Sequence, residues 1–226
     1  MAVAVLPNES VAATLRSFAA VNWMDNREER LMRLPLAPVE RTPDPGRREP
    51  CPQCGSQGFT VHQRSSKRVL DPQVDRVAVD RYRCKRCGWV GRSYPTGVDA
   101  GRQTIGLRQL SLMLYGAGMS LATVRATMMQ LGCGVSETTV RHNVDEARTH
   151  FAAEWRPQHW SFRIVSDAGA QAARLLGADG AIVLRIGGAP AEQRWLEIEL
   201  PTGAGADDLR WRFEQGIRWL HTALEA

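Results

Sequence analysis

Apolar residues recur at helical spacing in the middle of the chain. Residues Leu121, Val124, Met128 and Leu131 lie three, four and three positions apart, which places them on one face of a helix. A helix before this one is expected over 103–116, and a helix after it over 136–151. The apolar stripes of these two flanking helices consist of Ile105, Leu110, Met113 and Leu114 in the first, and Val140, Val144, Ala147 and Phe151 in the second. Ser120 and Ser136 each follow a glycine-containing break and are expected to cap the second and third helices.

The outward face of the predicted helix 136–151 is polar and partly basic. A helix-turn-helix protein places such a helix in the major groove of DNA, where arginine suits guanine and threonine suits a phosphate or a thymine methyl group. We therefore predict a helix-turn-helix over 100–152. Its DNA contacts would come from Glu137, Thr138, Arg141, His142 and Arg148. Two plainer interpretations stay open, since any three-helix bundle shows this periodicity and His142 is explained equally well as a solvated surface residue.

The N-terminal pattern predicts helix followed by linker. Residues 9–33 carry Val11, Leu15, Phe18 and Leu31 at spacings that suit a helix or helix pair, and an N-terminal helical segment is expected over 1–34. Prolines punctuate the next stretch, so 35–46 is expected to be an extended, mobile linker. No run approaches the ~20 apolar residues of a membrane span, and a basic secretory n-region is lacking, so a soluble protein without a membrane partner is expected.

Two pairs of cysteines stand out between residues 47 and 95. Cys51 and Cys54 form one C-x-x-C hook and Cys84 and Cys87 form the other, each followed by glycine. Paired hooks of this kind close a tetrahedral thiolate site, so one structural Zn²⁺ per chain and a zinc ribbon over 47–95 are predicted. Glycine suits the tight knuckle because it tolerates positive φ. Disulfides or a dithiol redox pair are the alternatives, although a single leftover thiol, Cys133, favours a reducing cytosol.

The ribbon region also holds the chain's positive charge. Between Arg47 and Tyr94 there are eleven basic and four acidic residues, a net charge of +7, whereas the whole chain carries +5. Such a patch is typical of proteins that bind a phosphate backbone, although a solvated basic face is the plain alternative. The alternation around Val77 and Val79 predicts strands within the ribbon. The ribbon residues predicted to contact DNA are Arg68, Arg83, Lys85 and Arg86.

The C-terminal part predicts a β-hairpin and a helix. Strand-forming residues flank a Gly-Gly-Ala-Pro turn between 179 and 203, and an apolar stripe of Leu209, Phe213 and Ile217 follows on 207–224. These elements are too few to cover a sheet, and a partial sheet would leave an open edge. Residues 160–226 are therefore expected to dock on a second copy, as a homodimer, or on the N-terminal helices, burying Trp195 together with that stripe.

The order of these parts resembles bacterial insertion-sequence transposases. The resemblance covers about 50–150 and rests on the two cysteine knuckles and on the phrase from Gly118 to Arg141. In that family a zinc ribbon and helix-turn-helix bind the element's ends, and an RNase H-like domain with a DDE or DDD triad cuts and joins DNA with two divalent metals. The resemblance implies that Asp179 matches the first catalytic carboxylate, and that 160–226 is a truncated RNase H-like segment.

Catalysis is not expected from this sequence alone. The second and third acids of the family's triad would come after Ala226, and Asp179 is equally well explained as a turn residue, with Asp167 as an alternative first acid. A two-metal site needs several converging carboxylates. An active enzyme would therefore need a second polypeptide to supply the missing acids.

The sequence thus predicts a multi-domain α+β protein, made of a zinc ribbon, a three-helix helix-turn-helix and a partial RNase H-like hairpin plus helix. Its expected function is sequence-specific binding of double-stranded DNA in the bacterial cytoplasm, at the nucleoid. The alternatives are the N-terminal part of an active transposase, and a zinc-ribbon module that binds protein or RNA.

Overall fold

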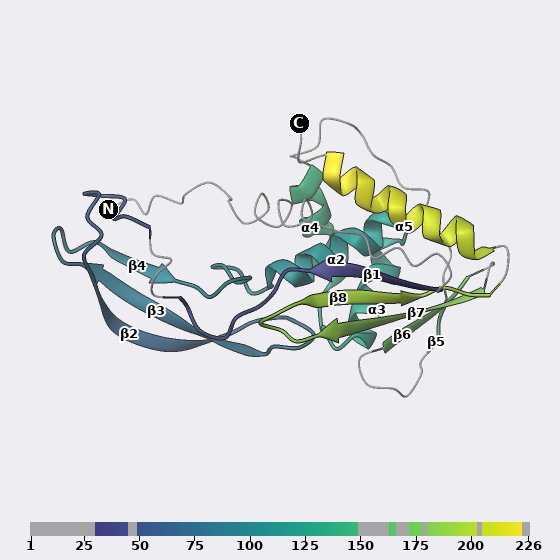
Figure 1. Ribbon diagram of the computed structural model, residues 1–226, viewed down its shortest axis with the longest axis horizontal. Helices are drawn as coiled ribbons and strands as arrows, with labels where there is room; N and C mark the ends of the chain where they lie inside the picture. Colours follow the sequence, from purple (N-terminus) through teal and green to yellow (C-terminus); the bar gives the residue numbers. More distant parts are fainter. Residues whose placement is uncertain are drawn as a thin grey trace.

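The chain forms two antiparallel sheets and a group of helices. The computed structural model describes residues 30–44, 49–148, 163–165, 172–177, 180–202 and 205–222, with side chains of 206–216 in the last range. Within these residues the fold is mixed α+β, with four helices. Figure 1 shows an elongated molecule, with the smaller sheet at one end and the larger sheet and the helices at the other.

The smaller sheet has three strands, in the order β2 (Phe59–Arg68), β3 (Arg76–Cys84) and β4 (Val90–Ser93). Their register is regular except for a bulge in β2 between Val61 and Gln63. A small valine cluster lies at its inner end, formed by Val39, Val69, Val74, Val77, Val79 and Val98. This cluster is separate from the main core, so the ribbon sheet has apolar packing of its own.

The larger sheet has five strands, in the order β1-β8-β7-β6-β5, and every neighbouring pair is antiparallel. The strands are β1 (Leu31–Leu36), β5 (Arg163–Val165), β6 (Ala172–Gly177), β7 (Gly180–Gly188) and β8 (Arg194–Glu199). Apolar residues alternate along them, so that one face is mostly buried and the other is half-exposed. The row Leu34–Leu196–Ile186 crosses three strands and is typical of the covered face.

Four helices complete the described fold: α2 (Ile105–Gly116), α3 (Leu121–Gln130), α4 (Glu137–Arg148) and α5 (Gly205–Thr222). The three helices predicted in the middle of the chain are confirmed. Ser120 caps α3 by accepting from the Thr123 amide at 3.2 Å, and Ser136 accepts from the Thr139 amide at 3.1 Å. Helices α2 and α3 contact the strands of the large sheet, so helices and sheet share one core rather than separate ones.

Residues 31–36 form a strand, so the prediction that the N-terminal helix extends to residue 33 is wrong. Met32, Leu34 and Leu36 are buried while Arg33 is exposed, which is the two-residue period of a strand. Pairing with β8, more than 150 residues away in sequence, decides this conformation. The remainder of the predicted helix, 9–29, lies outside the described residues.

The predicted mobile linker 35–46 is also wrong where the structure describes it. Val39 is fully buried in the valine cluster, and its amide donates to the Pro190 carbonyl at 2.6 Å. The Glu40 amide donates to Thr96 at 3.1 Å, and the Arg41 carbonyl accepts from Ala78 at 2.7 Å. The described part of the segment between β1 and the first cysteine hook is thus held in place by backbone hydrogen bonds of its residues other than proline.

The C-terminal part is more than the predicted hairpin plus helix. Strands β7 and β8 form the expected hairpin, but β5 and β6 extend it and β1 pairs with the edge expected to be open. Leu209 and Phe213 of α5 are buried in the main core, whereas Trp195 is only half-buried, with Arg33 over its ring. The segment therefore packs within its own chain. The side chain of Ile217 lies outside the described residues.

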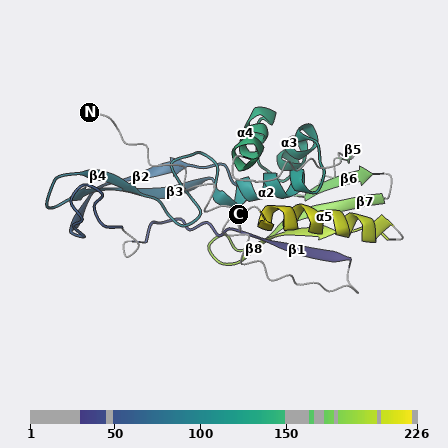
Figure 2. The ribbon, with the colours of Figure 1, turned by 90° about the horizontal axis from the view of Figure 1, so that it is seen from above.

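Helices α2 and α5 lie side by side (Figure 2). Their closest approach is at Gly116 and Gly216. A Cβ on Gly216 would lie 2.4 Å from the backbone carbon of Gly116, which no relaxed structure allows. This close approach therefore requires glycine in α5, although glycine within a helix costs about 1 kcal/mol relative to alanine.

Gly216→Ala tests this close approach. The clash is with backbone, so overpacking of about 1–3 kcal/mol should exceed the helix gain and lower the free energy of unfolding. Gly134→Ala is the control, since a Cβ there meets nothing within 4 Å. It should be neutral or slightly stabilising in denaturant unfolding. A Gly216→Ala protein as stable as wild type would contradict the close approach.

A fully buried ion pair joins the two sheets. Arg194 on β8 and Asp71, in the loop between β2 and β3, both have side chains that are 0% exposed, and the Arg194 Nη2 donates to both Asp71 oxygens at 3.1 and 3.0 Å. Arg194 Nη1 also donates to the Ala37 carbonyl at 3.3 Å. The hydroxyl of Thr104, the N-cap of α2, donates to Asp71 at 2.6 Å. One carboxylate thus ties the ribbon to a helix start and to the large sheet.

Asp71→Asn should leave the Arg194 charge buried without its partner. Breaking a buried pair in this way costs about 3–5 kcal/mol, which denaturant unfolding would measure. Asp75→Asn removes an exposed carboxylate from the same loop and should change stability by less than about 0.5 kcal/mol. Equal stability of the two variants would mean that the pair does not hold the sheets together.

Candidate metal centre and basic surface

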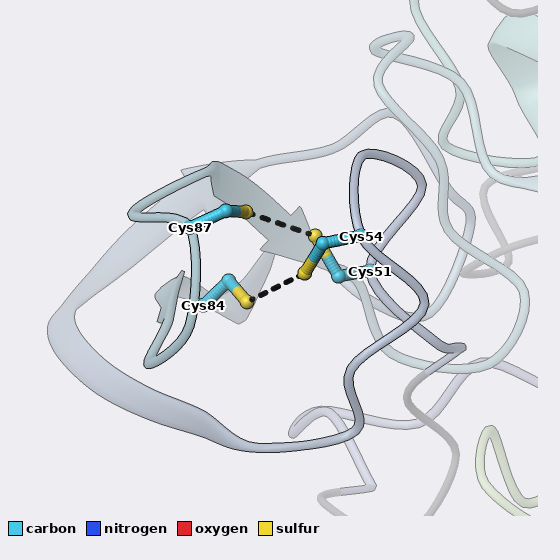
Figure 3. A group of neighbouring side chains, drawn as sticks. All are labelled: Cys51, Cys54, Cys84 and Cys87. Carbon is cyan, nitrogen blue, oxygen red and sulfur yellow. Dashed lines mark hydrogen bonds between the residues drawn. The ribbon is translucent and has the colours of Figure 1, made fainter.

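The four cysteines of the two hooks converge at the outer end of the ribbon sheet. Cys51 Sγ lies 3.6 Å from Cys87 Sγ, and Cys54 Sγ lies 3.6 Å from Cys84 Sγ (Figure 3). All four sulfur atoms lie within 4.8 Å of one another. A tetrahedral ion with bonds of about 2.3 Å to sulfur needs sulfur separations of about 3.8 Å. The cluster is therefore compatible with a structural zinc ion, and its sulfur distances exceed the ~2.05 Å of a disulfide.

The local backbone explains how each hook turns. Gly55 and Gly88 have φ of +68° and +75°, as expected from their positions after the second cysteine. Their amides donate to the carbonyls of Cys51 and Cys84 at 2.8 and 3.0 Å, which closes each turn. Hydrogen bonding from the Cys87 backbone amide lowers the pKa of Cys84 to about 6. Although a hydrogen bond from the Trp89 backbone lowers it, burial and hydrogen bonds with the other three thiols raise the pKa of Cys87, in the same hook, to about 12. The hook therefore favours the thiolate, which is the form that binds metal, at Cys84.

Aromatic side chains support the cysteine cluster from the sheet. Phe59 and Tyr82 pack edge to face with ring centroids 5.0 Å apart, and Trp89 packs on Tyr82 at 5.9 Å. The Trp89 ring lies over Gly91, where any side chain would collide with it. The fifth cysteine, Cys133, takes no part. It is buried in the main core, and burial raises the pKa of its thiol to about 12.

Basic side chains cover the ribbon, while two of its four acids are buried. The predicted DNA contacts Arg68, Arg83, Lys85 and Arg86 are all exposed, and Lys85 and Arg86 lie within the second hook. By contrast, the side chain of Asp80 is 3% exposed and pairs with Arg64 at 2.8 Å. The side chain of Asp71 is buried in its ion pair with Arg194. The ribbon surface is therefore more positive than the sequence count alone indicates.

Two exposed arginines of this surface, Arg81 and Arg92, were missing from the predicted contacts. They lie directly opposite each other on β3 and β4. The alternation of β3 could have placed Arg81 beside Arg83 on one face, but the partner on β4 depends on a strand register that the sequence does not reveal.

Helix α4 exposes the face predicted to read DNA. Glu137, Thr138, Arg141, His142 and Arg148 are all exposed, while Val140, Val144 and Ala147 are buried as expected. The face is not uniformly basic, however. Arg141 lies 3.6 Å from Glu137, and His142 lies 3.8 Å from Glu146. Arg148 donates to the Tyr115 hydroxyl at 2.8 Å, so this side chain is held against α2.

A buried polar residue, Asn143, fixes the position of α4. Its amide exchanges hydrogen bonds with the Gln103 amide at 3.0 and 2.9 Å and donates to Ser111 at 3.0 Å. Gln103 is bridged to Leu70 at the base of the ribbon. The sequence prediction gave Asn143 no role and missed this contact, although Asn143 falls beside Val144 in the apolar stripe.

The structure offers no support for a carboxylate metal site in the part of the chain it describes, where the cysteine cluster is the single group of metal-ligand type. Asp179 and Asp167 lie outside that part. Glu197 and Glu199 form ion pairs with Arg33 at 3.3 Å and Arg185 at 3.0 Å on the half-exposed sheet face.

In comparisons with protein-family models, curated proteins and solved structures, none matches this chain. No helix among the described residues is both long and apolar enough to cross a membrane. Fold and site together define a mixed α+β protein with a four-cysteine centre compatible with structural zinc.

Proposed function

We propose that this chain is a zinc-stabilised protein that binds double-stranded DNA in a sequence-specific manner, related to insertion-sequence transposases and without strand-transfer activity of its own. The distribution of charge on the ribbon carries the proposal. Eight of its basic residues are exposed, whereas two of its four acids are buried in ion pairs. Phosphate neutralisation supplies most of the affinity of proteins that bind nucleic acid without regard to sequence.

The proposed division of labour follows from the two surfaces. The ribbon supplies unpaired positive charge and would hold the DNA backbone. Helix α4 carries a mixture of both charge signs and small polar groups, which suits contacts with base edges better than it suits general attraction. Because Asn143 and Gln103 connect α4 to the ribbon base, the two surfaces keep a fixed relation to each other.

The metal is the first test of the proposal. Zinc analysis of protein prepared without chelator should give about one equivalent per chain, because a structural site is normally filled. Chelation should unfold 49–95 before the large sheet, since the valine cluster is separate from the main core. Hydrogen exchange would follow both regions.

Two cysteine variants supply the control. Cys84→Ser should abolish metal binding. Cys133→Ser should leave the metal content unchanged, because this thiol is buried in the main core and is not one of the four clustered cysteines. Less than about half an equivalent of zinc in wild-type protein would contradict the proposed centre.

DNA selection from random sequences, followed by binding of variants, tests the DNA proposal. Arg141→Ala should cost about 1–3 kcal/mol on the selected site and relax its specificity. Arg86→Ala should weaken binding to all sequences alike. It should also lower the salt slope, which is the steepness with which log K falls as log salt concentration rises, by about 0.9.

The comparison between selected and random DNA decides the role of α4. Equal losses on both for Arg141→Ala would show that the helix does not read bases. Failure to enrich any sequence, with binding to protein or RNA instead, would overturn the function as a whole.

A further inference from the structure

Three arginines share one face of the ribbon sheet near the cysteine cluster. The register places Gln63, Arg81 and Arg92 directly opposite one another across β2, β3 and β4. Arg83 follows Arg81 by two residues, so its side chain lies on the same face about 6.5 Å further along β3. It is flanked there by Thr60 and Val90.

This arrangement is unfavourable for the protein by itself. Like charges directly opposite on neighbouring strands destabilise a sheet, and Arg81 and Arg92 are such a pair. No acidic residue occupies the register positions of this face within the described strands. Among the salt bridges of the described residues, none involves Arg81, Arg83 or Arg92, and the Arg83 side chain donates to the Gly88 carbonyl, at 3.4 Å. The repulsion is therefore not relieved within the described structure.

The inner end of the same face is closed. Lys67 lies opposite Val77, and its ammonium bonds the carbonyls of Asp99 and Gly101 under the ring of Tyr94. Val77 and Val79 are covered by the valine cluster. Only the outer part, with the three arginines, Thr60 and Gln63, is open to a partner.

The opposite face of the sheet differs in chemistry. There Arg64 is neutralised by Asp80 through two contacts, at 2.8 and 3.3 Å, and the aromatic group of Phe59, Tyr82 and Trp89 occupies the outer end. Arg68 and Arg76 form another directly opposed pair at the inner end, and Arg76 donates to Ser66 at 3.4 Å. The predicted DNA contacts Arg68 and Arg83 thus lie on opposite faces of the ribbon sheet, so they cannot both contact the phosphates of one DNA strand lying along a single face.

We infer that the face bearing Arg81, Arg83 and Arg92 is where the ribbon holds the phosphate backbone of duplex DNA, with Thr60 and Gln63 as neutral hydrogen-bonding neighbours. The inference rests on the proposed DNA binding and adds one sheet face, with three residues, to the backbone contact proposed for Arg86. Phosphates provide the anions that relieve the repulsion. Arg81 and Arg83, about 6.5 Å apart along β3, would contact successive phosphates of one DNA strand. The binding is independent of sequence, because these side chains meet the backbone rather than base edges.

Two double variants of the full-length zinc protein test this assignment. Arg81→Gln with Arg92→Gln removes one opposed pair, and Arg68→Gln with Arg76→Gln removes the other, so each loses two exposed charges. Binding to a random duplex is measured across salt concentrations. Losing two phosphate contacts should lower the salt slope by about 1.8. If wild type and variant bind equally at 1 M salt, this slope change makes the variant roughly 60-fold weaker at 0.1 M salt. Arg68 lies on the opposite face and is therefore withdrawn from the predicted DNA contacts, so the Arg68 and Arg76 pair should stay within about 0.5 of the wild-type slope.

Thermal unfolding without DNA provides a second readout. Both double variants should melt at or above the wild-type temperature at low salt, because each removes a repulsive pair. Arg81→Lys with Arg92→Lys keeps the charge and should retain most of the binding, which keeps the test valid if the glutamine variant proves unstable.

The outcomes separate the inference from the proposed function. Absence of duplex binding by wild-type protein at low salt overturns both. Normal wild-type binding, with the control pair losing as much as the Arg81 and Arg92 pair, overturns only this face. A lysine variant that binds duplex DNA as weakly as the glutamine variant also contradicts it. The same binding measurement is made with an RNA hairpin of equal length. If the glutamine variant loses affinity for the hairpin and keeps its affinity for the duplex, the inference is wrong.

Discussion

The buried pair of Asp71 and Arg194 is the interaction on which the arrangement of this molecule depends. It brings together a loop of the ribbon, the start of α2 and the edge region of the large sheet, which are far apart in sequence. Each charge is fully removed from water, so each requires the other together with the neighbouring hydrogen bonds. The Gln73 and Val74 amides complete the set around Asp71, at 2.9 and 3.2 Å. The ribbon is thus attached mainly by directional polar contacts, with Leu70 as an apolar one, whereas the helices pack on the large sheet through apolar side chains.

The features that sequence reasoning predicted correctly are those encoded locally. The cysteine hooks, their glycines, the helix caps at Ser120 and Ser136, and the β7–β8 hairpin each depend on a few neighbouring residues. The exposed face of α4 follows from helical periodicity in the same way. These elements could be located without knowing what packs against them.

The features that were missed depend on partners distant in sequence. Residues 31–36 alternate like a strand, but four apolar residues within six suited a helix as well until β8 was present to pair with them. Asp71 and Arg194 read as ordinary charged residues, because nothing in either neighbourhood indicates the other. The same holds for Arg81 and Arg92, whose opposition is a matter of register. Burial of a charge is the hardest of these to foresee, since composition predicts the surface for it.

The pairing of β1 with β8 has a consequence for the order in which the molecule can form. The strand at residues 31–36 leaves the ribosome long before its partner at 194–199, so its hydrogen-bonding edge must wait for most of the chain to be made. The two cysteine hooks, in contrast, are closed by residues 51–87 and need little else. The ribbon can therefore mature during synthesis while β1 remains unpaired, and long-range pairing of this kind is slow and exposed to aggregation. Folding can thus begin at the end that carries the four cysteines and finish when β8 pairs with β1.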